Sequence, residues 1–271
     1  MPTVPCPGVD VVTPRTLGDA LRIRAERPDA LAIAGGTDVM VELNFDRARP
    51  ELFLNLAEVE ELAGWSREDG SIRLGARLTY AEAMHGPLSR ELPALAEASR
   101  TVGSPQIQNR GTIGGNLGTA SPAGDALPPL LLLDSHVVLG SLRGLRELPL
   151  RQFLLGPKRN ALEPDELILG VRVTPSSGRQ TFMKVGPRNA MVIAVVSLAL
   201  AVDEEREELR AAFGSAGPVP ALVTAPLGER EGFPELVAAA ARPIDDVRGS
   251  ASYRRHALRV LTGRALDRCL S

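Results

Sequence analysis

The feature that most constrains this chain is the stretch QNRGTIGGNLGTASPAGDALPP at residues 108–129. It holds five glycines, three hydroxyl side chains and, near its end, a single acid, Asp125. Such a segment offers few large apolar side chains to a core, and its glycines allow the backbone to approach another group closely. The fold must therefore place this stretch either in tight turns between regular elements or against a ligand.

A second glycine-rich segment, AIAGGTDVM at 32–40, follows a short apolar run that predicts a strand. Neither segment is a standard nucleotide fingerprint: the first lacks the Gly-Lys-Ser/Thr of a P-loop and the second lacks the three-glycine spacing of the Rossmann turn. Both still have the features of a phosphate cradle, because glycines let backbone N–H groups face an anion. Both contain little positive charge, so backbone dipoles would have to neutralise the anion. On the residues alone, dinucleotide binding and tight turns both stay open.

Composition narrows the function classes. The chain has 271 residues with 44% hydrophobic side chains, enough for one large domain or two ordinary ones. Its net charge of −2 provides no field that would gather nucleic acid or an anionic membrane. Two distant cysteines, Cys6 and Cys269, and three scattered histidines predict neither a disulfide framework nor a metal site. With no run of about 18 apolar residues and no signal-peptide pattern at the start, we expect a cytoplasmic protein.

Apolar spacing and capping residues predict a mixture of helices and strands. Helices are expected from Thr16 to Pro28, after Thr79, over 92–103, and from Ser250 or Ser252 to the end. Strands are expected at 30–35, 51–57, 71–75, 135–141, 165–173, 192–202 and from 208 onward. The glycine-rich stretch is expected to form loops. TPSSGRQ at 174–180 is the best linker by composition, and it predicts domains at 1–175 and 180–271.

Five segments carry a family resemblance. They are AIAGGTDVM, TIGGNLGTASPAGDALPPLLLLDSHVVLGS, LGPKRNALEPDELILGVRV, FMKVGPRNAMVIAVVSLA and DDVRGSASYRRHALRVL. In this order they resemble the FAD-binding medium subunits of the molybdenum hydroxylases, the xanthine dehydrogenase and carbon monoxide dehydrogenase family. The last segment is more similar to the xanthine dehydrogenase branch. The resemblance spans nearly the whole chain.

The resemblance implies an α+β fold, with a two-lobed FAD-binding domain of the vanillyl-alcohol oxidase type and a smaller C-terminal domain of antiparallel strands and helices. It implies FAD on this chain, with molybdopterin on a large partner subunit and 2Fe–2S clusters on a small one. Electrons would pass from the clusters to FAD and then to NAD⁺ or another acceptor, during oxidation of a purine such as xanthine. No catalytic residue is expected on this chain.

The family's two loops wrap the FAD diphosphate, and further positions meet the cofactor. The positions that match are Ala32, Ile33, Ala34, Gly35, Gly36, Thr37, Asp38, Val39, Thr112, Ile113, Gly114, Gly115, Asn116, Thr119, Asp125, Ile168 and Lys184. Asp125 would accept hydrogen bonds from ribose or ribityl hydroxyls, although it also suits a helix cap. Ile168 would lie against the flavin, or simply in the core. Lys184 would stabilise the reduced ring, or lie at the surface.

Two departures from the family stand out. The family often has an acid before the isoleucine at 193, whereas Val192 stands here, so a salt link to Arg188 is in doubt. Aromatic residues are also scarce, and the sequence identifies no ring to stack on the flavin. Two other hypotheses stay open: a stand-alone flavin oxidoreductase, and a scaffold subunit that has lost its flavin.

Overall fold

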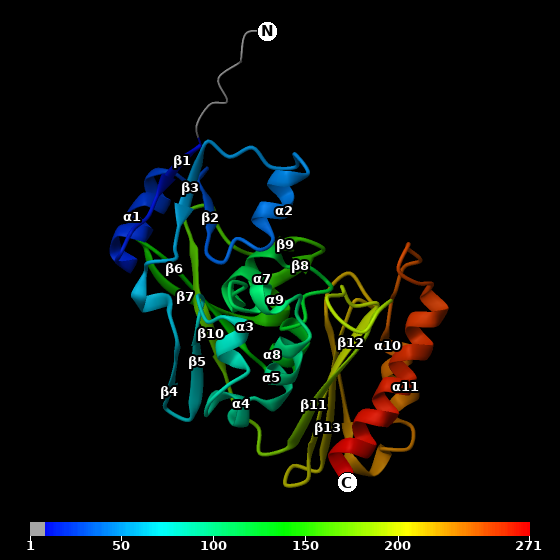
Figure 1. The fold of residues 1–271 in the computed structure, drawn as a ribbon. Coiled ribbons are helices and arrows are strands. Elements are labelled where there is room, and N and C mark those ends of the chain that lie inside the picture. Colours follow the sequence, from blue (N-terminus) through cyan, green and yellow to red (C-terminus); the bar gives the residue numbers. More distant parts are fainter. Residues whose placement is uncertain (1–8) are drawn as a thin grey trace.

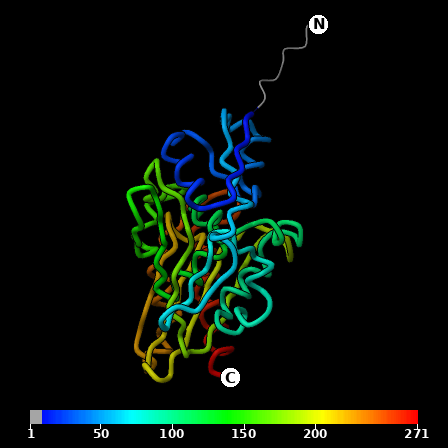
Figure 2. The backbone as a smooth tube through the Cα atoms, turned by 90° about the vertical axis from the view of Figure 1, so that its left-hand side faces the viewer, coloured from blue at the N-terminus to red at the C-terminus, as the bar shows by residue number. Residues whose placement is uncertain are grey.

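The computed structural model describes residues 9–271, whose strands form three main sheets (Figure 1). The first is a parallel sheet in the order β1-β3-β2, and we call it and its two helices the small lobe. Its elements are β1 (Asp10–Val12), α1 (Leu17–Glu26), β2 (Leu31–Ile33), α2 (Val39–Asn44) and β3 (Leu52–Asn55). The small lobe lies at one end of the molecule and the C-terminus at the other (Figure 2).

The second lobe is built on an antiparallel sheet in the order β4-β5-β10-β6-β7. Its strands are β4 (Trp65–Glu68), β5 (Ser71–Gly75), β6 (His136–Ser141), β7 (Gly144–Pro149) and β10 (Leu167–Val173). Its helices are η1 (Glu60–Leu62), α3 (Tyr80–Ala83), α4 (Leu88–Glu91), α5 (Pro93–Arg100), α6 (Pro105–Gln108), α7 (Ile113–Thr119), α8 (Leu127–Leu132) and α9 (Leu150–Phe153). A short hairpin, β8 (Leu154–Gly156) and β9 (Arg159–Asn160), leads back towards the sheet.

The third sheet is an antiparallel meander in the order β11-β12-β13-β14. Its elements are β11 (Arg179–Val185), β12 (Val196–Asp203), β13 (Glu208–Gly214), β14 (Ala221–Pro226), η2 (Leu227–Glu229), α10 (Phe233–Ala240) and α11 (Ala251–Leu270). Helices α10 and α11 cover its outer face, whereas α5 and α8 of the second lobe pack against its other face (Figure 1). The chain passes between the two sheets over 174–178, within the segment that the sequence predicts as a linker.

Strand β12 explains the long apolar run of the sequence, because every one of its residues is buried. Ala199 and Ala201 belong to the core shared with the second lobe, where small side chains leave room for α5 and α8. Leu198, Leu200 and Val202 point the other way, into the core formed with α10 and α11. The alternation follows from the two-residue period of a strand.

Helix starts agree closely with the capping residues. The Thr16 hydroxyl accepts a hydrogen bond from the Asp19 amide, and Thr79 forms a complete capping box with Glu82. Ser250, the first of the two predicted caps, accepts from the Tyr253 amide at the start of α11. These short polar side chains fix where each helix begins, as the sequence predicts.

Three expectations are wrong. Much of the glycine-rich stretch forms helices α7 and α8, with turns only over 120–126 between them, since Thr112 caps α7 and buried Ile113 and Leu117 anchor it. The last apolar strand begins at Val196, not at 192. Asp125 caps no helix, because Ala126 occupies the N-cap position of α8 and its side chain makes no capping bond.

Candidate functional site

The loop between β2 and α2 presents a run of backbone amides with no acceptor. Among residues 9–271 the structure provides no hydrogen-bond acceptor for the N–H groups of Gly35 through Val39. Gly36 has a φ of +78°, a left-handed conformation that glycine adopts without strain. Consecutive amides in such a turn form a concave site for an anion. The first glycine-rich segment therefore has the geometry of a phosphate cradle.

The two glycine-rich segments touch each other. A Cβ atom on Gly35 would lie 1.8 Å from the Arg110 carbonyl oxygen, so only glycine permits this approach. Thr119 Oγ1, near the end of α7, donates to Asp38 Oδ2 at 2.8 Å. The structure thus brings together the two segments that the sequence assigned to one cofactor, although Asp38 and Thr119 are 81 residues apart in the chain.

Helix α7 contributes few free amides, but it has a bare face, which we define as the exposed surface at Gly115 and Gly118, where no side chain projects. The amides of Ile113 and Gly114 donate to the Leu78 and Ala76 carbonyls, and that of Gly115 donates to Thr112 Oγ1. Gly114 is buried, and a Cβ there would lie 2.6 Å from the Ala76 oxygen. Gly115 and Gly118 are exposed on the outer face of the helix. A flat ligand can therefore approach this face without meeting a side chain at either glycine.

Asp125 and Lys184 form a buried ion pair between the two parts of the chain. Lys184 Nζ lies 2.5 Å from Asp125 Oδ2 and also donates to the Thr101 carbonyl at 3.0 Å. Their side chains are only 8% and 5% exposed, respectively, so Lys184 is not a surface residue. Burial raises the pKa of Asp125 to about 6, although the charge and hydrogen bond of Lys184 act in the opposite direction.

Two buried oxygens in this region have no partner among the described residues. They are Asp125 Oδ1 and Asn116 Oδ1. A buried acceptor without a donor is costly, and native structures usually satisfy it with water or a ligand. Gly124 makes room for the Asn116 amide, since a Cβ there would lie 2.6 Å from Nδ2. Both oxygens suit a ligand that carries hydroxyl groups.

The remaining predicted positions lie around these groups. Ala32 and Ile33 belong to β2, and Ala34 through Thr37 are half-buried in the loop that follows it. Ile168 is a nearly buried residue of β10, and its Cδ1 atom lies beneath Gly118 of α7. Its position is compatible with both expectations, a core residue and a neighbour of the cofactor.

The sequence did not identify Tyr80 and Lys158 as part of this region. The Tyr80 ring is buried against Gly111, and burial together with the Asp125 and Asp38 carboxylates raises its pKa. Lys158 pairs with Glu42 of α2 at 2.6 Å, and its amide donates to the Ala120 carbonyl. The Gly-Pro turn before Lys158 was the only signal for its position, and Tyr80 was marked only as the start of a helix.

Arg188 has no carboxylate partner among the described residues. Its guanidinium donates to the carbonyl groups of Ala190 and Met191. With Val192 in place of the acid, Arg188 therefore bonds to backbone carbonyl groups.

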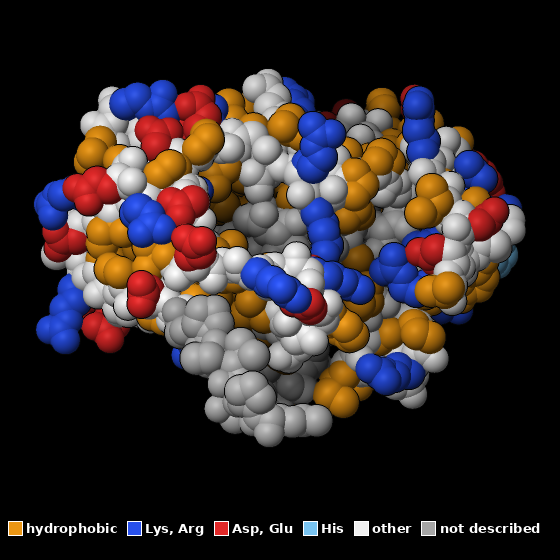
Figure 3. Space-filling model, turned by 90° about the horizontal axis from the view of Figure 1, so that it is seen from above, with side chains coloured by type: hydrophobic (Ala, Val, Ile, Leu, Met, Phe, Trp, Pro, Cys, Tyr) orange, Lys and Arg blue, Asp and Glu red, His pale blue; other side chains and the backbone are white. Residues whose placement is uncertain are grey.

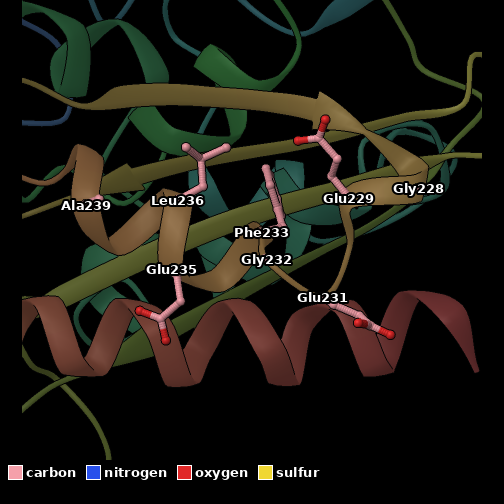
Figure 4. A pocket seen from close by; sticks show the side chains of 8 residues that line it. All are labelled: Gly228, Glu229, Glu231, Gly232, Phe233, Glu235, Leu236 and Ala239. Atoms are coloured by element: carbon pink, nitrogen blue, oxygen red, sulfur yellow. The ribbon is translucent and has the colours of Figure 1, made fainter.

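Other parts of the described surface are less suited to a cofactor. One groove, about 570 Å³, lies beside α10 and is lined by residues that include Leu236 and three glutamates (Figure 4). Its Glu235 is paired with Arg259 at 3.3 Å. Viewed from the end that carries the small lobe, the surface is hollowed near its centre, with Lys and Arg side chains around the hollow (Figure 3).

Neither a cluster of metal ligands nor a membrane-spanning helix occurs in the part of the chain that the structure describes. Within 9–271, no three His, Cys, Asp or Glu side chains come together as metal ligands would. In the same range, none of the helices has the length and apolar character needed to cross a bilayer.

The residues present fit a dinucleotide with a diphosphate and a polyhydroxyl chain. The acceptor-free amides of Gly35–Val39 suit the anion, the bare face of α7 suits close packing, and the two unpartnered oxygens suit hydroxyls. FAD has all three chemical features, and the geometry therefore supports the cofactor that the sequence implies.

Comparison with known proteins agrees with this fit. The family described as "FAD binding domain in molybdopterin dehydrogenase" matches residues 7–176. The putative xanthine dehydrogenase FAD-binding subunit of Escherichia coli K12 is 31% identical over 275 residues, covering 94% of each chain. The nicotinate dehydrogenase FAD-subunit of Eubacterium barkeri is 36% identical over 197 residues, 70% of this chain and 67% of its own.

Solved structures show the same fold. Carbon monoxide dehydrogenase from Hydrogenophaga pseudoflava contains a chain that superposes with a TM-score of 0.89, at 24% identity, covering 97% of this chain and 98% of that one. The match extends over both parts of the molecule, the two lobes and the third sheet. The family match, the relative that covers nearly the whole chain and the contact between the two glycine-rich segments agree with one another. This chain therefore belongs to the FAD-binding subunits of the molybdenum hydroxylases and is an oxidoreductase subunit.

Proposed function

We propose that this chain is the electron-transfer subunit of a cytoplasmic molybdenum hydroxylase that oxidises a purine such as xanthine. It accepts electrons from 2Fe–2S clusters on a small partner subunit and passes them to NAD⁺ or another acceptor. A large partner subunit carries the molybdenum cofactor and oxidises the substrate. The main support for this proposal is the contact between the two glycine-rich segments, where five acceptor-free amides lie beside the bare face of α7.

Each part of the site has a distinct task in this proposal. The amides of Gly35–Val39 hold the diphosphate, and Thr119 keeps that loop against α7 through Asp38. Asp125 Oδ1 and Asn116 Oδ1 accept hydrogen bonds from cofactor hydroxyls. Ile168 closes the apolar side.

Lys184 supplies the fixed positive charge of the site. Its ammonium is held by Asp125 and the Thr101 carbonyl, so it cannot rotate away into solvent. A preorganised charge favours states in which negative charge develops nearby. FAD, when bound, supplies the ability to take up two electrons and release them to a second carrier.

The relatives support the purine and the complex. The similar Escherichia coli chain is named for xanthine dehydrogenase and covers nearly this whole chain. The Eubacterium relative is named for nicotinate, so the fold serves more than one heterocycle. In this proposal the large partner, which carries the molybdenum cofactor, determines which substrate is oxidised.

Spectroscopy of the purified chain tests the cofactor. A yellow protein with an absorbance band near ~450 nm, a property of oxidised flavin, is expected. Chromatography of the released cofactor should identify FAD and not FMN, because the cradle is built for a diphosphate. Protein that stays colourless after incubation with FAD would favour the scaffold hypothesis.

Purification with its partners tests the assignment to a complex. The co-purifying chains should include one with molybdopterin and one with 2Fe–2S clusters, and xanthine should reduce the complex faster than nicotinate. NADH should bleach the flavin of the isolated chain if NAD⁺ is the acceptor. Xanthine oxidation by the isolated chain, with no other polypeptide detected by mass spectrometry, would instead support a stand-alone oxidoreductase.

A further inference from the structure

The segment DDVRGSASYRR contains a buried arginine that the cofactor site does not explain. Arg254 lies in the first turns of α11 between exposed neighbours, yet its own side chain is only 2% exposed. Its Nη1 donates to the carbonyl oxygens of Val195 and Ser215, each at 2.6 Å, and its Nη2 donates to Asp246 Oδ1 at 2.6 Å. One guanidinium therefore ties together three separate segments of the C-terminal domain.

Asp246 is held ready for this contact. It also accepts hydrogen bonds from the Arg248 amide at 2.8 Å and from the Arg248 guanidinium at 3.0 Å. Burial by itself would raise its pKa, but these bonds and the charges of Arg248 and Arg254 outweigh burial and lower the pKa to about 2. The carboxylate stays ionised at neutral pH, so Arg254 keeps its counter-charge.

The carbonyl groups that Arg254 holds belong to Val195 and Ser215, and the amides of these residues bond to segments next to the candidate flavin site. The amide of Val195 donates to the carbonyl of Val185, the residue after Lys184, at 2.8 Å. The amide of Ser215 donates to the carbonyl of Pro122, in the turn that leads to Asp125, also at 2.8 Å. Arg254 thus contacts two residues that are hydrogen-bonded to Val185 and Pro122, which lie one residue after Lys184 and three residues before Asp125.

The backbone conformation of Ser215 is held by its hydrogen bonds to Pro122 and Arg254. Its φ is +61°, a left-handed conformation that is costly for a residue with a side chain. The bonds from its amide to Pro122 and from Arg254 to its carbonyl hold it in this conformation. An apolar side chain at 254 could fill the space but could not fix these carbonyl groups.

We propose that Arg254 is a positioning residue that sets the placement of the Lys184–Asp125 pair by fixing Val195 and Ser215. The proposal rests on the proposed function, in which that pair faces the flavin. A role confined to anchoring α11 predicts a loss of stability alone. A positioning role predicts a change in the flavin that depends on Lys184.

A double-mutant cycle separates the two roles. Arg254→Met, Lys184→Met and the double variant are compared by the Kd for FAD, the visible circular dichroism of the bound flavin and its reduction potential. We expect Arg254→Met to weaken FAD binding about tenfold and to change the potential in the same direction as Lys184→Met. In the Lys184→Met background, the same substitution should change the potential little. Additive effects on the potential would overturn the proposal.

Arg210 provides the matched control, because it is also a largely buried arginine that ties the third sheet to the second lobe. It donates to the Leu132 carbonyl and to Asp134, away from Lys184 and Asp125. Arg210→Met should lower stability but leave the flavin potential and dichroism as in the wild type. Equal flavin effects in the two methionine variants would overturn the proposal.

Asp246→Asn decides the question if Arg254→Met does not fold. It removes the counter-charge but keeps an acceptor, so we expect a smaller shift of the flavin potential in the same direction, again suppressed by Lys184→Met. An Asp246→Asn protein with wild-type potential and dichroism would overturn the proposal. A wild-type chain that cannot bind FAD would instead refute the proposed function, so the two failures are distinguishable.

Discussion

Gly114 and Gly115 are adjacent, yet the structure gives them different reasons to be glycine. Gly114 is buried, and its missing side chain lets α7 pack on the backbone at Ala76. Gly115 is exposed, and a Cβ there would contact only Thr112 Oγ1, at 3.1 Å. One glycine therefore serves packing and the other leaves a surface open.

Alanine at each position should separate these roles. Gly114→Ala should destabilise the protein by about 1–3 kcal/mol through overpacking, as measured by urea unfolding. Gly115→Ala should keep the stability within about 1 kcal/mol but weaken FAD binding, measured by flavin fluorescence titration. Full FAD affinity in a folded Gly115→Ala protein would show that the cofactor does not approach this face.

The buried carboxyl of Asp125 predicts a pH dependence of stability. Its folded pKa of about 6 lies above the ordinary value of 3.8, so the folded state binds the proton more tightly than the unfolded chain. Its contribution to the free energy of unfolding should therefore fall as pH rises from about 4 to 6, and stay constant above that range. Urea unfolding of the wild type and Asp125→Asn should show this as a difference that changes between pH 4 and 6. Parallel pH profiles would contradict the assignment.

At the scale of elements, the small lobe shares an apolar core with β10, and two polar contacts add to it on the side of the candidate site. Thr119 of α7 bonds Asp38, and Lys158 of the β8–β9 turn pairs with Glu42 of α2. Both contacts cross from α7 and its neighbours to α2 and the loop before it. They hold the acceptor-free amides against the bare helix face.

Removing one of these contacts should loosen the loop. Thr119→Val preserves shape but deletes the hydroxyl, and the lost hydrogen bond is worth about 1 kcal/mol. Hydrogen exchange at the first bonded amides of α2, those of Met40, Val41 and Glu42, should accelerate several-fold, while α11 exchanges as before. Thr224→Val, at an exposed threonine of β14, is the control and should change neither region. Unchanged exchange in the Thr119 variant would mean that other contacts hold the loop.

The sequence predicted elements well where one side chain decides the outcome. Thr16, Thr79 and Ser250 cap the helices that they mark, because capping is a local hydrogen bond. The helix α7 was missed because its glycines lower intrinsic helix propensity, and only tertiary packing of Ile113 and Leu117 compensates. Tyr80 and Lys158 were missed for a related reason: their role comes from contacts with residues distant in sequence.

At the scale of the whole molecule, the third sheet completes the core of the second lobe. Phe182, Ala199 and Ala212 belong to the same buried cluster as the residues of α5 and α8. Glu97 of α5 adds a polar connection, accepting from the Phe182 amide at 2.7 Å and from Arg268 of α11 at 2.9 Å. The two proposed domains therefore share one of the molecule's buried clusters.

A fragment that ends at residue 176 should therefore fail to fold stably, although the family match covers the same range. It would expose the apolar faces of α5 and α8 and leave Asp125 without its cation. Circular dichroism and size-exclusion chromatography should show an aggregated or partly folded product. A monomeric fragment that binds FAD with the affinity of the full chain would show that the first part is autonomous.

The ion pair between Asp125 and Lys184 also bears on how such chains diverge. Asp125 lies in the first half of the chain and Lys184 in the second. Recombination between distant homologues would therefore pair the aspartate of one parent with the lysine of another. Chimaeras should keep their colour only when both parents place an acid and a lysine at these positions and when the Val195 and Ser215 contacts also match. We therefore expect related chains to have inherited the two halves together, even where the sequence of the linker between them differs.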